Sequence, residues 1–196
     1  MPALLKVLAP LLDLSGPTAY GSTLAQVAAQ AETPSGQPAI IWPLEDPLAP
    51  TGGIVVLRGN LAPNGAVVKA SGVHPSMMRH EGPARVLNCE KDVQECLLGG
   101  RVSPGDVLVV RYEGPCVGHV CPEAAVGGPL AALRDGDTIE IDIPNRTLHV
   151  RLDDEELRAR LEEWQPPART IPAGFLRLYA DCVGPASQGA VLGRQR

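Results

Sequence analysis

A strict alternation of apolar and polar residues marks one β-hairpin in the second half of the chain. Residues 138–143 place isoleucine at every second position, and residues 147–152 alternate leucine and valine with His149 and Arg151. Side chains of a strand point alternately to its two faces, so each run has one apolar face. Residues 144–146 lie between the runs. The pattern predicts a hairpin that buries one face.

Further short β-branched runs, bounded by Gly and Pro, precede this hairpin at residues 53–59, 65–71, 83–88 and 107–112. Their spacing is typical of a β-sandwich or barrel. Between the third and fourth runs, residues 88–98 predict a helix whose apolar face is formed by Val93, Leu97 and Leu98. The fold class predicted from these elements is β-rich α+β.

Helical patterns flank the strand-rich region. Residues 2–12 and 24–31 predict two short helices, the first interrupted by Pro10 and the second capped by Ser22 or Thr23. A third helix should follow the cap Asp153, bury Leu157 and Leu161, and end at Pro166. A last amphipathic segment covers residues 173–182.

These patterns divide the chain into four parts. Residues 1–32 are helical, residues 33–50 form a Pro-rich linker or arm, residues 51–182 form the β-rich domain, and residues 183–196 form a flexible tail.

Composition narrows the function classes. The chain has 196 residues, 44% of them hydrophobic, and a net charge of −5. These values disfavour disorder, nucleic acid and anionic membranes. No apolar run reaches the roughly 18 residues of a membrane helix, and no signal peptide is recognisable. We therefore expect a soluble cytoplasmic protein, or an organellar one if the source is eukaryotic, with its five cysteines reduced.

Cys116, His119 and Cys121 form the densest cluster of reactive side chains. A fourth ligand at a familiar metal-site spacing is missing, so we interpret these residues, like Cys89 and Cys96, as packing residues rather than metal ligands.

Four charged residues are candidates for acid–base chemistry, namely Lys69, Glu81, Glu113 and Glu123. Surface charge or ion pairing explains them better. The glycines match no phosphate-binding loop. The residues themselves thus predict no catalytic, cofactor-binding or metal site.

Beyond these patterns, residues 50–69 resemble a segment of the dihydroxy-acid dehydratase family, the iron–sulfur dehydratases of dihydroxy acids and sugar acids. Six further blocks resemble that family in the same order, at residues 80–86, 104–107, 110–115, 116–125, 135–146 and 189–192. The resemblance implies a barrel-like C-terminal domain with peripheral helices, preceded by short helices left from the N-terminal domain.

The resemblance also implies an activity for complete family members. They convert a 2,3-dihydroxy carboxylate into a 2-keto acid and water, with an iron–sulfur cluster as Lewis acid, Mg²⁺ at the carboxylate side and a serine base. Both the departing hydroxide and the weakly acidic C2 proton need electrophilic help.

This chain departs from the family in two ways. It resembles only about the last third of a member, and none of its cysteines matches a cluster cysteine. The blocks that end at Pro115 and begin at Cys116 are fused, whereas members carry between them a segment with a Mg²⁺-ligand glutamate and the serine base. We therefore carry over no catalytic residue, and Cys121 stands where members usually have serine.

Two functional hypotheses follow. The chain is either a fragment of a dehydratase of branched-chain amino-acid synthesis, with a sugar-acid dehydratase as the alternative, or a non-catalytic interaction domain. The expected partners are a second copy in a homodimer, a dehydratase N-terminal domain, or a small hydroxy acid. Because the missing segment should help fill the barrel, we expect a marginal or partner-dependent fold.

Overall fold

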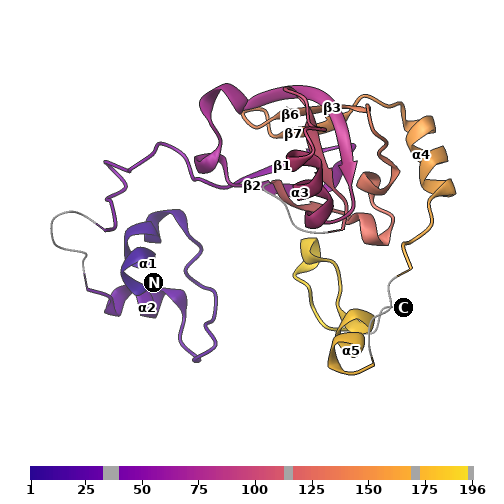
Figure 1. Cartoon of the computed structure of the whole chain (residues 1–196). Helices are drawn as coiled ribbons and strands as arrows, with labels where there is room; N and C mark the ends of the chain where they lie inside the picture. The colour runs from indigo at the N-terminus through magenta and orange to yellow at the C-terminus, as the bar shows by residue number, and fades with distance from the viewer. Residues whose placement is uncertain (33–39, 113–116, 169–172, 194–196) are drawn as a thin grey trace. The chain divides into compact units, whose positions relative to one another are not determined.

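The chain forms two compact units, Met1–Gly52 and Gly53–Arg196 (Figure 1). The structure, a computed structural model, describes residues 1–32, 40–112, 117–168 and 173–193. Residues 33–39 of the expected linker lie outside this set. Residues 40–52 contain no helix or strand, and the four-part division of the chain stays a prediction.

The first unit contains the two predicted N-terminal helices. Helix α1 spans Pro2–Leu8 and continues as the 3-10 turn Ala9–Leu11, and α2 spans Leu24–Gln30. Thr23 caps α2 reciprocally: its hydroxyl oxygen accepts from the Gln26 amide at 3.2 Å, and its amide donates to Gln26 Oε1 at 2.9 Å. Of the two possible caps, Ser22 and Thr23, it is therefore Thr23 that caps the helix.

The second unit is built on a mixed sheet of seven strands in the order β4-β3-β6-β7-β1-β2-β5, curled into a half-barrel (Figure 1). This agrees with the predicted β-rich α+β class. The strands are β1 (Val55–Gly59), β2 (Ala62–Val68), β3 (Arg79–Leu87), β4 (Val107–Val110), β5 (Val117–Cys121), β6 (Thr138–Asp142) and β7 (Thr147–Val150).

The predicted hairpin is confirmed as β6 and β7, which pair antiparallel from Ile139 opposite Val150 to Asp142 opposite Thr147. Ile139, Leu148 and Val150 are buried, and so is Ile143 beyond the end of β6. Alternation predicted this hairpin because both strands have one face on the core and the other toward solvent.

The four earlier runs also form strands, with shifted bounds. The largest shift is in β3, which begins at Arg79 and accommodates Pro83, a residue without an amide hydrogen. Hydrogen bonding resumes at the next residue, where the Ala84 amide donates to the Asp137 carbonyl at 2.8 Å. The sequence pattern does not predict strand β5, because its residues show no strict alternation of apolar and polar side chains.

The seam between β1 and β7 joins the two halves of the sheet. The pair is parallel and its strand register consists of Arg58 opposite Thr147. Asn60, in the tight turn after β1, extends this pairing through its side chain. Its side-chain amide donates to the Val150 carbonyl, and its Oδ1 accepts from the Val150 amide, both at 2.8 Å. A Cβ on Gly59 would lie 2.0 Å from the Leu148 carbonyl oxygen, so the seam requires glycine there.

Three helices accompany the sheet: α3 (Glu90–Leu98), α4 (Asp154–Glu163) and α5 (Phe175–Cys182). The apolar face predicted for α3 is partly wrong. Leu97 and Leu98 are 53% and 90% exposed, whereas Cys96 is buried. Val93 lines the cavity under the sheet and Cys96 is buried. Leu98, two residues after Cys96, is turned by about 200° from it around the helix and therefore faces solvent, and Leu97 lies in the last turn of the helix.

Helix α4 begins as predicted, since Asp153 Oδ1 accepts from the Glu156 amide at 2.7 Å, and it buries Leu157. It ends at Glu163, before the Pro-Pro pair. Arg160 fixes it to the loop before β6 through an ion pair with Asp137 at 2.7 Å, and both side chains are largely shielded from solvent.

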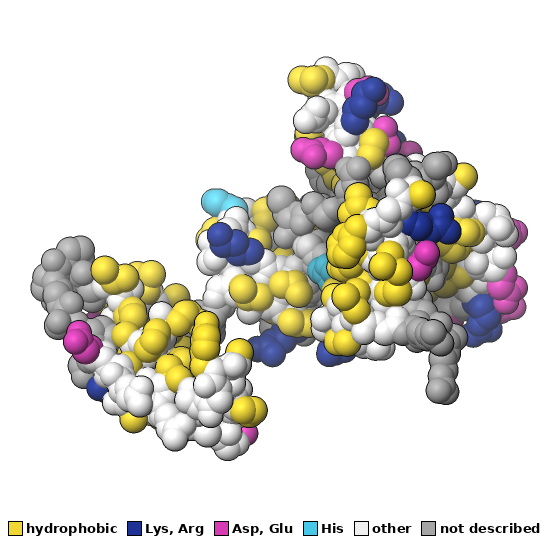
Figure 2. Space-filling view, turned by 90° about the horizontal axis from the view of Figure 1, so that it is seen from below, with side chains coloured by type: hydrophobic (Ala, Val, Ile, Leu, Met, Phe, Trp, Pro, Cys, Tyr) yellow, Lys and Arg dark blue, Asp and Glu magenta, His cyan; other side chains and the backbone are white. Residues whose placement is uncertain are grey.

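Helix α5 exposes most of its large apolar side chains, including Phe175 at 75%, and such exposed side chains occur on both units (Figure 2). Residues 183–193 contain the 3-10 turn Ala186–Gln188 and a bridge between Val183 and Leu192. None of the described helices has the length and hydropathy required of a membrane span.

We predict that Asn60→Ala lowers the free energy of unfolding by about 2–4 kcal/mol, because it removes both hydrogen bonds to the buried Val150 backbone and leaves those groups unsatisfied. Urea denaturation measures the change. The matched control is Asn145→Ala, whose side-chain bond to Asp142 is exposed, and we expect it to cost less than about 1 kcal/mol. Equal losses in the two variants would contradict this role for Asn60.

Candidate functional site

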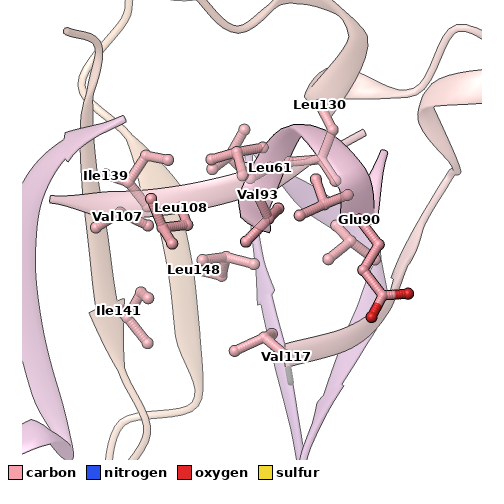
Figure 3. Close-up of a pocket in the computed structure, with 13 residues that line it drawn as sticks. Leu61, Glu90, Val93, Val107, Leu108, Val117, Leu130, Ile139, Ile141 and Leu148 are labelled. Atoms are coloured by element: carbon pink, nitrogen blue, oxygen red, sulfur yellow. The ribbon is translucent and has the colours of Figure 1, made fainter. Parts of the chain in front are cut away.

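An apolar cavity of about 690 Å³ lies inside the half-barrel (Figure 3). Its walls come from both edge strands, from the concave face of the sheet and from α3. Its lining includes Val107 and Leu108 of β4, Val117 and Val120 of β5, Leu148 of β7 and Val93 of α3. Glu90 is the charged residue of the lining, and its carboxylate points away from the apolar side chains (Figure 3).

Strand β5 carries the reactive side chains and contains a bulge. Gly118 pairs with Val67 and Cys121 pairs with Gly65, so β5 advances one residue more than β2 over this stretch. His119 adopts a left-handed conformation with φ 59°. Bulges commonly re-aim side chains beside functional sites, and this one accompanies the exposed position of His119 between the cavity-lining Val117 and Val120.

His119, Cys121 and Glu123 form one cluster at the end of β5, with ligand atoms within 4.8 Å of one another. His119 Nε2 lies 3.4 Å from Glu123 Oε1, and the Cys121 thiol donates to the same oxygen at 3.6 Å. The thiol is buried, whereas the histidine is about half exposed. Glu123 therefore links a buried sulfur to a solvent-accessible imidazole.

Burial raises the pKa of the Cys121 thiol, and the nearby Glu123 carboxylate adds to the effect, which outweighs the opposing hydrogen bond from Ser187. The thiol therefore stays protonated at neutral pH and is a poor nucleophile, because the thiolate is the reactive form. In the absence of a metal ion, Cys121 acts as a hydrogen-bond donor to Glu123.

A smaller pocket of about 250 Å³ adjoins this cluster and is lined by His119, Glu123, Arg111 and Tyr112, among others. Arg111 is held by Asn88 Oδ1 at 2.9 Å and by the Ala131 carbonyl at 3.3 Å. The Trp164 indole donates to the Tyr112 hydroxyl at 3.4 Å. The arginine, tyrosine and histidine around this small pocket are donors suited to a carboxylate, and the acidic residue of the lining, Glu123, lies beside His119.

The other candidate residues that the structure describes do not join the cluster on β5. Glu81 forms a surface ion pair with Arg151 at 2.6 Å, and Lys69 is exposed, as the surface-charge interpretation expected. Cys96 is buried, and Cys89 occupies the N-cap position of α3 without a capping hydrogen bond from its side chain. Glu113 and Cys116 lie outside the described residues.

The structure brings Glu123 together with Cys121 and His119, a grouping that the sequence analysis does not predict. The available signal is the spacing, since the three residues occur at every second position. Arg111 carries no such signal, because nothing in its local sequence places it beside β5.

A family profile matches the chain over residues 39–116 and 114–190. Its description is "Dihydroxy-acid/6-phosphogluconate dehydratase C-terminal". Together these two matches cover most of the protein. The chain therefore belongs to the dihydroxy-acid/6-phosphogluconate dehydratase family and carries its C-terminal region.

Curated relatives named dihydroxy-acid dehydratase agree with this assignment. The protein from Syntrophotalea carbinolica is 44% identical over 192 aligned positions, which cover 78% of this chain and 34% of the relative. The one from Acetivibrio thermocellus is 39% identical over 234 positions, which cover 98% of this chain and 42% of the relative. The chain thus spans between a third and a half of the length of these relatives.

The comparison also locates an internal difference. The alignment with the Acetivibrio thermocellus protein runs over 234 positions although this chain has 196 residues, so the relative carries residues without counterpart here. The two matches to the family profile meet at residues 114–116. This indicates that the additional residues of the relatives fall between β4 and β5, at the junction noted in the sequence.

The described residues do not fit the two groups that the resemblance implies for whole family members. An iron–sulfur cluster is held by several cysteine thiolates, but the His119–Cys121–Glu123 cluster offers one thiol. Mg²⁺ prefers oxygen ligands in octahedral geometry, and this cluster offers one carboxylate beside sulfur and nitrogen. The prediction that the chain alone binds neither group therefore stays a prediction, with this mismatch in its favour.

We predict that iodoacetamide at pH 8 alkylates Cys121 more slowly than Cys89 or Cys182, because the Cys121 thiol is buried and its pKa is raised. Mass spectrometry of the digested protein measures the three rates. Equal rates for the three cysteines would contradict the described environment of Cys121.

The same raised pKa predicts a pH dependence of stability. A folded-state pKa above the unfolded value means that the native state keeps its proton longer, so stability falls as pH rises above the ordinary thiol range near 8.5. Urea unfolding at pH 7 and pH 10 should show a larger loss for the wild type than for Cys121→Ser, which lacks this titrating group. An identical pH dependence of the two proteins would refute this assignment.

Proposed function

We propose that the chain is the C-terminal part of a dihydroxy-acid dehydratase of branched-chain amino-acid synthesis, and that these 196 residues do not carry out the dehydration by themselves. The first half of the proposal is supported by an alignment that covers 98% of the chain, at 39% identity, with a relative named dihydroxy-acid dehydratase. The observation behind the second half is the mismatch between the donor cluster on β5 and the cofactors of the family.

The small pocket beside β5 supports a substrate-facing role for this domain. Arg111 presents a guanidinium held in place by two hydrogen bonds, and such a fork suits the carboxylate of a hydroxy acid. His119 lies on the opposite strand edge of the same pocket. In this proposal the domain orients the acid, and the groups that break the C–H and C–O bonds come from residues beyond this chain.

The alternative substrate is a sugar acid, because the family description also names 6-phosphogluconate dehydratase. The curated relatives reported above favour the dihydroxy acid, since their name is dihydroxy-acid dehydratase. A compound with a phosphate would need more cationic donors than the single arginine that lines the pocket provides.

The test combines cofactor and activity measurements on anaerobically purified protein. We expect iron and acid-labile sulfide well below stoichiometric amounts, and no formation of 2-keto acid from a branched 2,3-dihydroxy acid or an aldonic acid. The full-length Acetivibrio thermocellus relative, prepared in the same way, is the positive control. Stoichiometric iron and sulfide together with turnover by this chain would overturn the proposal of inactivity.

A further inference from the structure

We propose that the apolar cavity between β4 and β5 is a receptor for one extended peptide, supplied by another polypeptide, which inserts as an additional strand. The inserted strand would pair its main chain with both edges and place apolar side chains against Leu148 and Val93. The proposal concerns binding, so it does not depend on whether the chain catalyses dehydration.

The first argument is the state of the two sheet edges. Strand β4 pairs with β3 and β5 pairs with β2, and within the described sheet neither has a partner on its other side. Both edges nevertheless border one cavity, since Val107 and Leu108 of β4 and Val117 and Val120 of β5 line it (Figure 3). Unpaired edges of this kind are templates for strand addition.

The second argument is the direction of the two edge strands. Counting the parallel and antiparallel pairs across the sheet, β4 and β5 run in the same sense. A strand inserted in the opposite sense would pair antiparallel with both. It would thereby join the two ends of the half-barrel through ordinary antiparallel ladders.

The third argument is the short connection between these strands. Parallel strands normally need a crossover of about a dozen or more residues, whereas only residues 111–116 connect β4 to β5. The two matches to the family profile meet at this junction, and the alignment with the Acetivibrio thermocellus relative is longer than this chain. The cavity therefore has the position and the apolar lining expected of the space that a returning segment fills.

The same features argue against other occupants. A small apolar molecule fills volume but offers no donors and acceptors to the two rows of edge backbone groups. A second copy could pair edge to edge, but its own apolar side chains line its own cavity and would leave both cavities unfilled. An extended peptide with one apolar face meets both requirements.

The probes are synthetic peptides of about ten residues, the length of a single strand, which together cover the sequence that the Acetivibrio thermocellus relative carries between its counterparts of Val110 and Val117. We expect one of them to bind the full chain with 1:1 stoichiometry, to raise the thermal unfolding midpoint, and to slow amide exchange in residues 107–110 and 117–121 by at least about tenfold. A scrambled peptide should do none of these.

Two variants test the site itself. Val120→Lys puts a charge into the cavity and should weaken peptide binding by at least about tenfold. The matched control Val56→Lys changes a half-exposed residue of β1 that does not line the cavity, and its affinity should stay within about twofold of wild type. If Val120→Lys does not fold, two altered peptides are tested against the wild-type protein instead. One carries aspartate on the face toward the cavity and should bind at least about tenfold more weakly, and the other carries aspartate on the opposite face and should bind within about twofold of the original peptide.

Several outcomes would overturn the proposal. They are the absence of peptide binding by the folded chain, binding that leaves the amides of β4 and β5 unprotected, and equal affinities of the Val120 and Val56 variants. A stable dimer that protects both edges, seen by sedimentation and amide exchange, would assign the surface to a second copy. A co-purifying lipid in the cavity, detected by native mass spectrometry, would assign it to a small ligand.

Discussion

The pairing of β1 with β7 is the interaction on which the rest of the second unit depends. One half of the sheet consists of β4, β3, β6 and β7, and the other of β1, β2 and β5. The parallel pair at Arg58 and Thr147 joins them, and Asn60 extends the pairing by bonding both backbone groups of Val150. Without this seam the two halves would not share a core, and β4 and β5 would not face one cavity.

The seam also determines where the chemistry lies. Because the sheet curls about it, the reactive end of β5 comes close to Arg111, which follows β4 directly in the chain but belongs to the opposite edge of the sheet. The polar pocket and the apolar cavity are thus neighbours that share lining residues such as Val117 and Val120. A segment that entered the cavity would contact the same strands that present His119 and Arg111.

Membership of a family of enzymes and catalytic capacity are separate questions for this chain. The family assignment rests on ordered sequence blocks and on two profile matches that cover most of the residues. Catalysis depends on particular donor atoms at particular positions, and the β5 cluster supplies sulfur, nitrogen and oxygen in a combination that suits neither cofactor of the family. A fold can be retained where such a site is incomplete.

The sequence by itself determined the local elements, because their causes are local. Alternation predicted β6 and β7, Asp153 predicted the start of α4, and the two possible caps Ser22 and Thr23 predicted the start of α2. Only the tertiary structure decided that Leu97 and Leu98 are exposed, that Asn60 bonds Val150, and that Arg111 lines the same pocket as His119. Those outcomes depend on which residues the curled sheet brings together from distant positions, and hydrophobic periodicity carries no information about such pairings.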